Sequence, residues 1–248
     1  MKKLYFKNQL SEQIVGILEE NKNSDVVIII AHGFNASKDH GFLPKLASKL
    51  RKRFNVFRFD FSGNGESQGK FEDQCLKKQI GELKAAVEFM RKRFKKVFVA
   101  GHSLGACVAL AEYCKYKDVE GLIFIAPAFA LSKRLLISLF GRTLKSFIFG
   151  KVCFKNHERK CLKRKFFLER LIFKFKMKSL LKIANKVSFA ILAECDRLIN
   201  NEKCIKIFKK TKINYATIKN SGHGFKSDIA LRELATNIER FLVNFINK

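Results

Sequence analysis

Hydrophobic and polar residues along this chain form two patterns that alternate. Continuous apolar runs are typical of strands covered on both faces of a sheet, and they predict strands at 25–31, 97–100 and 119–126. Shorter or less continuous apolar stretches at 55–60, 187–193 and 213–219 continue this series of strands. Apolar residues spaced three or four apart predict helices at 41–51, 80–93, from 104 onward and at 227–247. A polar turn between 3–8 and 12–20 predicts an opening hairpin. Strands that alternate with helices predict an α/β fold with a mostly parallel central sheet and helices on both faces.

The alternation stops between residues 131 and 186. This stretch is too long for an ordinary connection, and it is rich in apolar residues such as Leu136, Phe140 and Phe166. We expect a mainly helical cap at 131–186, inserted over the strand ends of a core formed by 1–130 and 187–248. Within the insertion, 173–178 alternates strictly between apolar and basic residues, and the pattern leaves both a helix and a strand open there.

One pentapeptide carries a chemical signal. Residues 101–105 read Gly-His-Ser-Leu-Gly and fit the G-x-S-x-G pattern. Any glycine-rich serine turn can match it, but this one lies between a predicted strand and a predicted helix. That setting is typical of a nucleophile elbow, which holds a serine hydroxyl at the carboxyl edge of the sheet. Gly101 and Gly105 supply the residues without side chains that such a turn needs. We therefore expect Ser103 to be a nucleophile.

A serine hydroxyl needs a base to take its proton. Of the five histidines, only His223 falls between the last predicted strand and the last helix, in a loop with Gly222 and Gly224. We expect His223 to be this base, although a solvated loop histidine is the alternative. The other histidines follow the 25–31 strand, lie in the elbow pointing elsewhere, or fall in the insertion: His32, His40, His102 and His157.

The acid that orients the base is found by elimination. Three aspartates follow the elbow, at 118, 196 and 228. Asp118 precedes a strand and Asp228 lies in the closing helix, whereas Asp196 follows a strand at the edge where ligands bind. The order Ser103, Asp196, His223 is the order expected of such a site. A turn or helix N-cap aspartate is the alternative for Asp196.

Two backbone N–H groups are expected to stabilise a developing oxyanion. One belongs to Leu104, directly after the nucleophile, and the other to Phe34 in the loop after the 25–31 strand. The alternative for His32-Gly33 is a plain turn after a buried strand.

These residues together resemble the α/β-hydrolase superfamily. The chain looks like the small esterases related to cinnamoyl/feruloyl esterases, monoacylglycerol lipases and serine aminopeptidase-like hydrolases. The resemblance rests on 32–34, 59–67, 101–105, Asp196 and 222–223, and it spans nearly all of the chain except the insertion. It implies an α/β-hydrolase fold, a Ser103–Asp196–His223 triad and an oxyanion hole at Phe34 and Leu104. Ala193 and Ala106 replace glycines that the family often has, and the cap does not match, so the resemblance implies no particular substrate.

Composition bears on the location of the protein and on whether it uses a cofactor or a metal. The seven cysteines form an odd set without CxxC spacing, and no secretory signal precedes them, so we expect reduced thiols and a cytoplasmic location. No run approaches the ~20 apolar residues of a membrane-spanning helix. Phosphate-cradling loops and metal-ligand spacings are missing, so we expect neither a cofactor nor a metal.

The formal net charge of +28 is unusual and unevenly spread. Residues 131–186 hold 17 Lys/Arg against Glu158 and Glu169, a net of +15. Mixed with Phe, Leu and Ile, this composition is typical of a basic interfacial helix. We hypothesise that the cap covers the active site with an apolar acyl or aryl pocket, and that its Lys/Arg face contacts an anionic substrate or an anionic membrane to which the protein is peripheral. Solvated basic faces are the plain alternative. Nucleic acid is a weaker candidate, because no recognised nucleic-acid module is present.

The expected activity is hydrolysis of a small apolar carboxylic ester through an acyl-enzyme on Ser103. The same groups could act as a peptidase or amidase, a thioesterase or an acyltransferase. A different possibility is a catalytically idle hydrolase fold that binds anionic surfaces. The sequence leaves the physiological substrate and the oligomeric state open.

Overall fold

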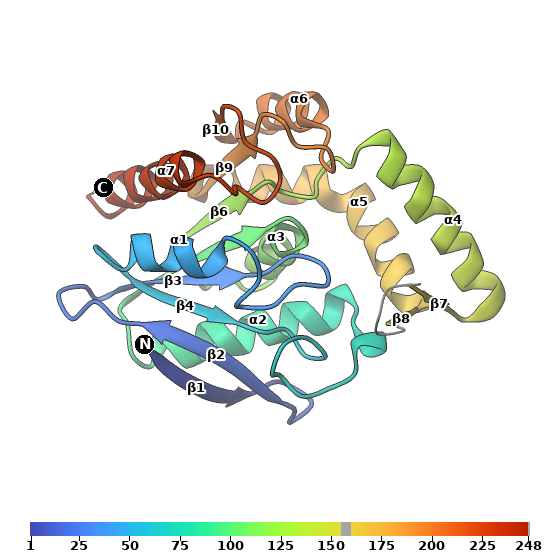
Figure 1. The fold of residues 1–248 in the computed structure, drawn as a ribbon, viewed down its shortest axis with the longest axis horizontal. Helices are drawn as coiled ribbons and strands as arrows, with labels where there is room; N and C mark the ends of the chain where they lie inside the picture. The colour runs from blue at the N-terminus through green and yellow to red at the C-terminus, as the bar shows by residue number, and fades with distance from the viewer. Residues whose placement is uncertain (155–159, 248) are drawn as a thin grey trace.

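A computed structural model describes residues 1–154 and 160–247. Residues 155–159, with His157 and Glu158 among them, and Lys248 lie outside the described residues. The structure is built around one eight-stranded sheet in the order β1-β2-β4-β3-β5-β6-β9-β10 (Figure 1). Its strands are β1 (Lys2–Lys7), β2 (Gln13–Glu19), β3 (Val26–Ala31), β4 (Asn55–Phe59), β5 (Lys96–His102), β6 (Gly121–Ile125), β9 (Ser188–Ala193) and β10 (Asn214–Ile218).

The sheet is mostly parallel, which confirms the predicted fold class. Along the order β4-β3-β5-β6-β9-β10 each strand runs parallel to the next, whereas β1 and β2 form the expected antiparallel hairpin at one edge and β2 pairs antiparallel with β4. Every residue of β3 is buried, because helices cover both faces of the parallel part. The uninterrupted apolar runs follow from this double coverage.

Two layers of helices cover the sheet (Figure 1). The helices outside the insertion are α1 (Leu43–Leu50), α2 (Leu76–Arg91), α3 (Leu104–Tyr116), α6 (Asn201–Thr211) and α7 (Asp228–Ile246), with short 3₁₀ turns η1 (Phe71–Asp73) and η2 (Asn185–Val187). One apolar core lies under α1 and α7, and the other lies under α2, α3, α6 and the inner helix of the insertion. Helix α2 begins four residues before the predicted helix at 80.

The insertion forms α4 (Lys133–Phe149), a small hairpin of β7 (Lys151–Cys153) and β8 (Cys161–Lys163), and the long helix α5 (Arg164–Ala184). Its inner helix α5 buries Phe173, Met177 and Leu181 on one side, so the alternating stretch 173–178 is helical. Helix α4 lies at the outer edge of the molecule (Figure 1). Within the described residues, no helix is long and apolar enough to cross a membrane.

Two cysteines of the insertion form a disulfide. Cys153 and Cys161 are directly opposite each other across the β7–β8 hairpin and are bonded. The expectation of reduced thiols is wrong for this pair, because a hairpin brings together two cysteines that lie eight residues apart and have no CxxC spacing. The other five cysteines are free. The cytoplasmic location stays a prediction, and the disulfide weighs against it because such bonds are rare in reducing compartments.

Candidate active site

Four loops meet at the carboxyl edge of the sheet. They follow β3, β5, β9 and β10, which lie in the sheet in the order β3-β5-β6-β9-β10. These loops carry Phe34, Ser103, Asp196 and His223, respectively. In open α/β sheets this edge is where ligands bind, so the topology gathers all the candidate residues where chemistry is expected.

Ser103 lies at a strained turn between β5 and α3. Its backbone has φ 53° and ψ −110°, a conformation that non-glycine residues rarely adopt. The Ser103 N–H donates to the carbonyl of Ile125 in β6 at 2.9 Å, which fixes the turn against the neighbouring strand. The flanking glycines are required sterically, because a Cβ on Gly105 would lie 2.2 Å from the carbonyl oxygen of Ala31. A Cβ on Gly101 would lie 2.5 Å from the backbone nitrogen of Ala106.

Asp196 and His223 form a hydrogen-bonded pair. The His223 Nδ1 lies 2.6 Å from the Asp196 Oδ2, and the Asp196 side chain has no exposed surface. The second carboxylate oxygen, Oδ1, accepts the backbone N–H groups of Leu198 at 2.8 Å and Ile199 at 3.0 Å. The carboxylate therefore also closes its own turn, as the alternative interpretation expected. With Nδ1 protonated toward Asp196, the lone pair of the neutral imidazole is on Nε2.

The histidine loop lies beside the elbow. The rings of His102 and His223 are 4.8 Å apart between centroids, and Ser103 directly follows His102. Among the described residues, no hydrogen bond joins the Ser103 hydroxyl to His223. Such bonds are often long in the absence of substrate and shorten when substrate binds.

The sequence interpretation missed the role of His102, which was expected to point away from the site. Its Nε2 lies 3.2 Å from the carbonyl oxygen of His223, and its ring packs edge-on against Phe42. Burial, with the neighbouring His223 imidazole, lowers the pKa of His102 to about 3, so this ring is neutral near pH 7. A neutral ring with hydrogen on Nε2 donates to that carbonyl and holds the His223 loop against the elbow. The ring's position beside the loop is visible only in three dimensions.

The oxyanion-hole candidates lie on both sides of Ser103. Leu104 is the first residue of α3, so its N–H has no acceptor inside the helix. The loop after β3 comes so close that a Cβ on Gly33 would lie 3.2 Å from the Cβ of Ser103. Phe34 follows Gly33, and Asn35 turns the chain away with φ 51°.

His32 supports this loop rather than taking part in proton transfer. Its Nδ1 lies 2.8 Å from the Gly33 carbonyl oxygen, and its Nε2 accepts the Phe61 N–H at 3.0 Å. Burial lowers its pKa to about 4, so it is neutral near pH 7.

A buried ionic cluster fixes the glycine-rich loop at 59–67. Asp60 is fully buried, accepts the backbone N–H groups of Lys38 and Glu66, and pairs with the Lys38 ammonium at 3.0 Å. Burial alone would lower the pKa of Lys38, but hydrogen bonds to Glu66, Asp39 and Asp60 outweigh it and raise that pKa. The sequence interpretation found the loop but not the lysine that anchors it.

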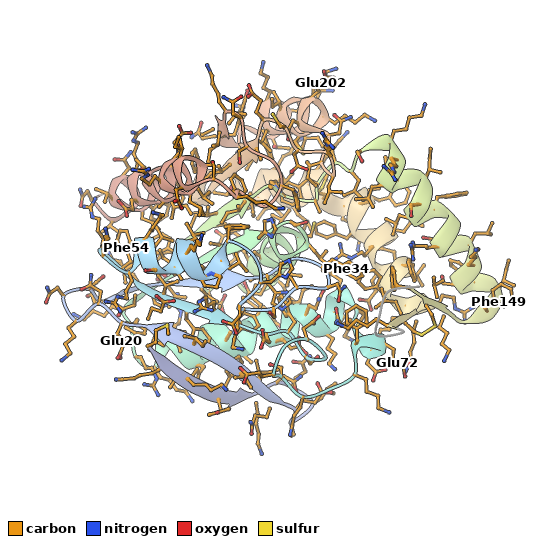
Figure 2. All side chains as sticks on the ribbon, in the orientation of Figure 1. Glu20, Phe34, Phe54, Glu72, Phe149 and Glu202 are labelled. Atoms are coloured by element: carbon orange, nitrogen blue, oxygen red, sulfur yellow. A yellow bond between two sulfur atoms is a disulfide. The ribbon has the colours of Figure 1, made fainter. Side chains whose placement is uncertain are left out.

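Aromatic side chains join the loop after β3 to the insertion. The Phe34 ring lies 5.6–5.9 Å from the rings of Phe71, Phe154 and Phe166, and two of these three come from the insertion. Phe34 is 39% exposed and lies between the sheet and the cap helices (Figure 2). Apolar surface therefore borders one side of the Ser103 turn.

A cavity of about 370 Å³ is bordered by His40, Phe42, His102 and His223. A larger cavity of about 810 Å³ is lined by residues of β1, its turn and α2, and none of the candidate site residues borders it. In residues 1–154 and 160–247, no cluster of three His, Cys, Asp or Glu could hold a metal ion.

Comparison with known proteins places the chain in a family. Residues 22–165, more than half of the chain, match the family model described as serine aminopeptidase, S33. The chain belongs to the serine aminopeptidase S33 family. This agrees with the resemblance inferred from the motifs.

Two curated relatives come from mycoplasmas, and both are named "Putative esterase/lipase 2". The protein of Mycoplasma pneumoniae is 35% identical over 128 residues, covering 48% of this chain and 46% of that protein. The protein of Mycoplasma genitalium is 26% identical over 183 residues, covering 71% of this chain and 64% of that protein. The matches thus span about half to two thirds of the length of these relatives.

Solved structures show the same fold over the whole chain. Est1E of Butyrivibrio proteoclasticus with bound ferulic acid has a TM-score of 0.82 at 20% identity, and the match covers 99% of this chain and 100% of that one. The esterase Pf2001 of Pyrococcus furiosus has a TM-score of 0.71 at 22% identity, with 98% and 92% covered. These likenesses establish the α/β-hydrolase fold.

Proposed function

We propose that this protein is a serine hydrolase that cleaves carboxylic esters through an acyl-enzyme on Ser103. The observation that carries the proposal is the 2.6 Å pair of Asp196 and His223 beside a strained Ser103 turn. A buried carboxylate on Nδ1 keeps the imidazole in the tautomer that can accept a proton on Nε2. The strained turn presents the serine side chain at the sheet edge.

In the proposed reaction, the Ser103 hydroxyl attacks the ester carbonyl while His223 Nε2 takes its proton. The backbone N–H groups of Leu104 and Phe34 stabilise the oxyanion of the tetrahedral intermediate. When the intermediate collapses, the imidazolium gives its proton to the leaving alcohol. Water then attacks the acyl-enzyme by the same sequence, with His223 as base, and releases the acid and free Ser103.

The aromatic group around Phe34 supports an apolar acyl or aryl group in the substrate. Phe34 and the partly exposed Phe154 present ring surface beside the proposed oxyanion hole, and the buried Phe166 packs against Phe34. In this proposal the leaving alcohol occupies the cavity bordered by His223 and receives its proton there. The names of the mycoplasma relatives and the ferulic acid bound to Est1E support an ester over an amide.

The test is turnover of a substrate panel: nitrophenyl esters of short and long acids, methyl ferulate, and aminoacyl amides. We expect the esters to be cleaved and Ser103→Ala to lose at least 1000-fold in rate. The matched control is Ser48→Ala, an exposed serine on α1, which should behave as wild type. Unchanged ester turnover by Ser103→Ala would refute the nucleophile. Faster turnover of amides than of all esters would instead favour the peptidase reading of the same groups.

A further inference from the structure

Helix α4 exposes a continuous row of large apolar side chains. Along one side of the helix lie Ile137, Phe140, Leu144, Phe147 and Ile148, which we call the α4 stripe, and their exposed fractions range from 46% to 74%. Their spacing of three and four residues places them on one helical face. Soluble proteins rarely expose contiguous apolar surface of this kind without a partner.

On the side of α4 that faces the protein, Ser146 is the one residue of the helix that is buried. Leu135, Leu136 and Leu139 are partly buried, and Leu139 packs against the core. The Arg142 guanidinium lies over the Phe154 ring at 4.4 Å. An amphipathic helix of a globular protein normally turns its apolar face to the core. Helix α4 therefore carries apolar residues on its outer side as well as its inner side, and the α4 stripe is suited to an apolar environment outside this chain.

Positive charge flanks the α4 stripe. Lys133, Arg134, Lys145 and Lys151 are all exposed, and within the described residues none of them forms an ion pair. The one acidic side chain in 131–154 and 160–186 is Glu169, which is engaged by the Lys77 N–H at 2.8 Å and by Lys165. The surface therefore combines exposed hydrophobic residues with uncompensated cations.

We propose that the α4 stripe is an interfacial anchor that lies in the surface of an anionic lipid bilayer. Apolar side chains enter the acyl-chain boundary while the flanking Lys and Arg side chains contact anionic headgroups. A helix of this length is ~25 Å long, so it can lie flat on the bilayer. Its position at the outer edge of the molecule, with Phe149 at the tip, leaves it free to do so (Figures 1 and 2).

Two other occupants fit the surface less well. A second copy of this chain would bring two strongly basic insertions together, and like charges oppose such a contact. A nucleic acid would pair with the cations but would leave the apolar row without a partner. A bilayer with anionic lipids satisfies both features at once. The inference does not depend on the proposed hydrolase function.

The test is co-sedimentation of the full chain with vesicles of phosphatidylcholine alone or with 30% phosphatidylglycerol, at 0.1 M salt. We expect strong binding to the anionic vesicles and at least tenfold weaker binding to the neutral ones. Phe140→Ser combined with Phe147→Ser should reduce binding at least tenfold. Lys133→Gln combined with Lys145→Gln should also reduce it, by about fivefold per charge. Equal binding to both kinds of vesicle, or unchanged binding by the double Phe variant, would overturn the proposal.

Matched controls separate the α4 stripe from general surface properties. Ile229→Ser removes an apolar side chain that is 67% exposed on α7, and Lys209→Gln with Lys210→Gln removes two exposed charges on α6. Both controls should bind vesicles as wild type does. The double Phe variant should keep wild-type thermal stability and wild-type turnover of a soluble short ester, because its changes are on the surface. Ser103→Ala should still bind vesicles, so the failure of either proposal can be recognised separately.

Two other results would assign this surface to a different partner. Light scattering that finds a dimer broken by the double Phe variant, together with no vesicle binding, would assign the α4 stripe to a second copy. Binding to RNA that is unaffected by the double Phe variant, again without vesicle binding, would assign the basic surface to nucleic acid.

Discussion

Replacing Asp196 by asparagine tests how the proposed base is oriented. The carboxylate Oδ1 accepts two backbone N–H groups, from Leu198 and Ile199, and Oδ2 faces the His223 Nδ1. An asparagine at this position must keep its carbonyl oxygen toward the two N–H donors. Its NH₂ group then faces Nδ1 and donates to it. The histidine is thereby forced into the tautomer with hydrogen on Nε2, which cannot accept the serine proton.

The size of the effect follows from this geometry. The change keeps the volume of the side chain and both backbone hydrogen bonds, so the fold should be retained. What is lost is the correct tautomer and the stabilisation of the imidazolium, which in a comparable triad lowers the turnover rate by about 10⁴-fold. At 1.36 kcal/mol for each factor of ten, this corresponds to ~5 kcal/mol of transition-state stabilisation.

The assay compares kcat of wild type and Asp196→Asn on the best nitrophenyl ester at pH 7.5, with thermal unfolding of both proteins as the control for folding. We expect a rate lowered by three to five orders of magnitude at nearly unchanged melting temperature. A kcat within tenfold of wild type would refute the reasoning. It would leave Asp196 as a turn residue and require another group to orient His223.

Three further predictions concern stability. Burial, with Asp118 nearby, raises the pKa of Glu112 to about 9, so the folded protein holds a proton there that the unfolded chain releases above pH 4.5. The protein is therefore expected to lose stability as the pH rises from 4.5 to 9. Glu112→Gln should therefore stabilise the protein by up to ~4 kcal/mol in urea unfolding at pH 7.5 and by much less at pH 5; an unchanged difference would contradict the assignment. Lys38→Met leaves the buried carboxylate of Asp60 unpaired and should cost about 3–5 kcal/mol, or roughly 10 °C in melting temperature, whereas a shift under 2 °C would show that the ion pair is dispensable. Burial lowers the pKa of His32 to about 4, so the unfolded chain binds this proton first and the protein loses stability as the pH falls below 6.5. His32→Gln should make the slope of unfolding free energy against pH between 6.5 and 4.5 smaller by ~1.4 kcal/mol per pH unit. An identical slope would be the contrary result.

Much of the fold could be predicted from the sequence because its strands are buried on both faces. The fully apolar β3 and the apolar run 97–100 within β5 are not typical of an amphipathic surface element, so these continuous runs predict a parallel sheet. The elbow could be found because its two glycines meet backbone atoms at distances that no side chain tolerates. Chain order then limited the loops on which a base and an acid could lie.

Other features depend on contacts between distant segments that leave no periodic signal. The packing of His102 against the His223 loop joins residues 121 positions apart. Lys38 reaches Asp60 across 22 positions, and nothing about a single lysine in a loop predicts that it is buried. The Cys153–Cys161 bond depends on a short hairpin, and the exposure of the α4 stripe depends on how that helix packs.

The most direct test of the central claim is covalent labelling with a fluorophosphonate probe, followed by mass spectrometry of the digested protein. The account predicts one phosphonylated peptide with the adduct on Ser103, and no labelling of Ser103→Ala while Ser48→Ala is labelled like wild type. A folded wild-type protein that stays unlabelled, or an adduct on another residue, would contradict it.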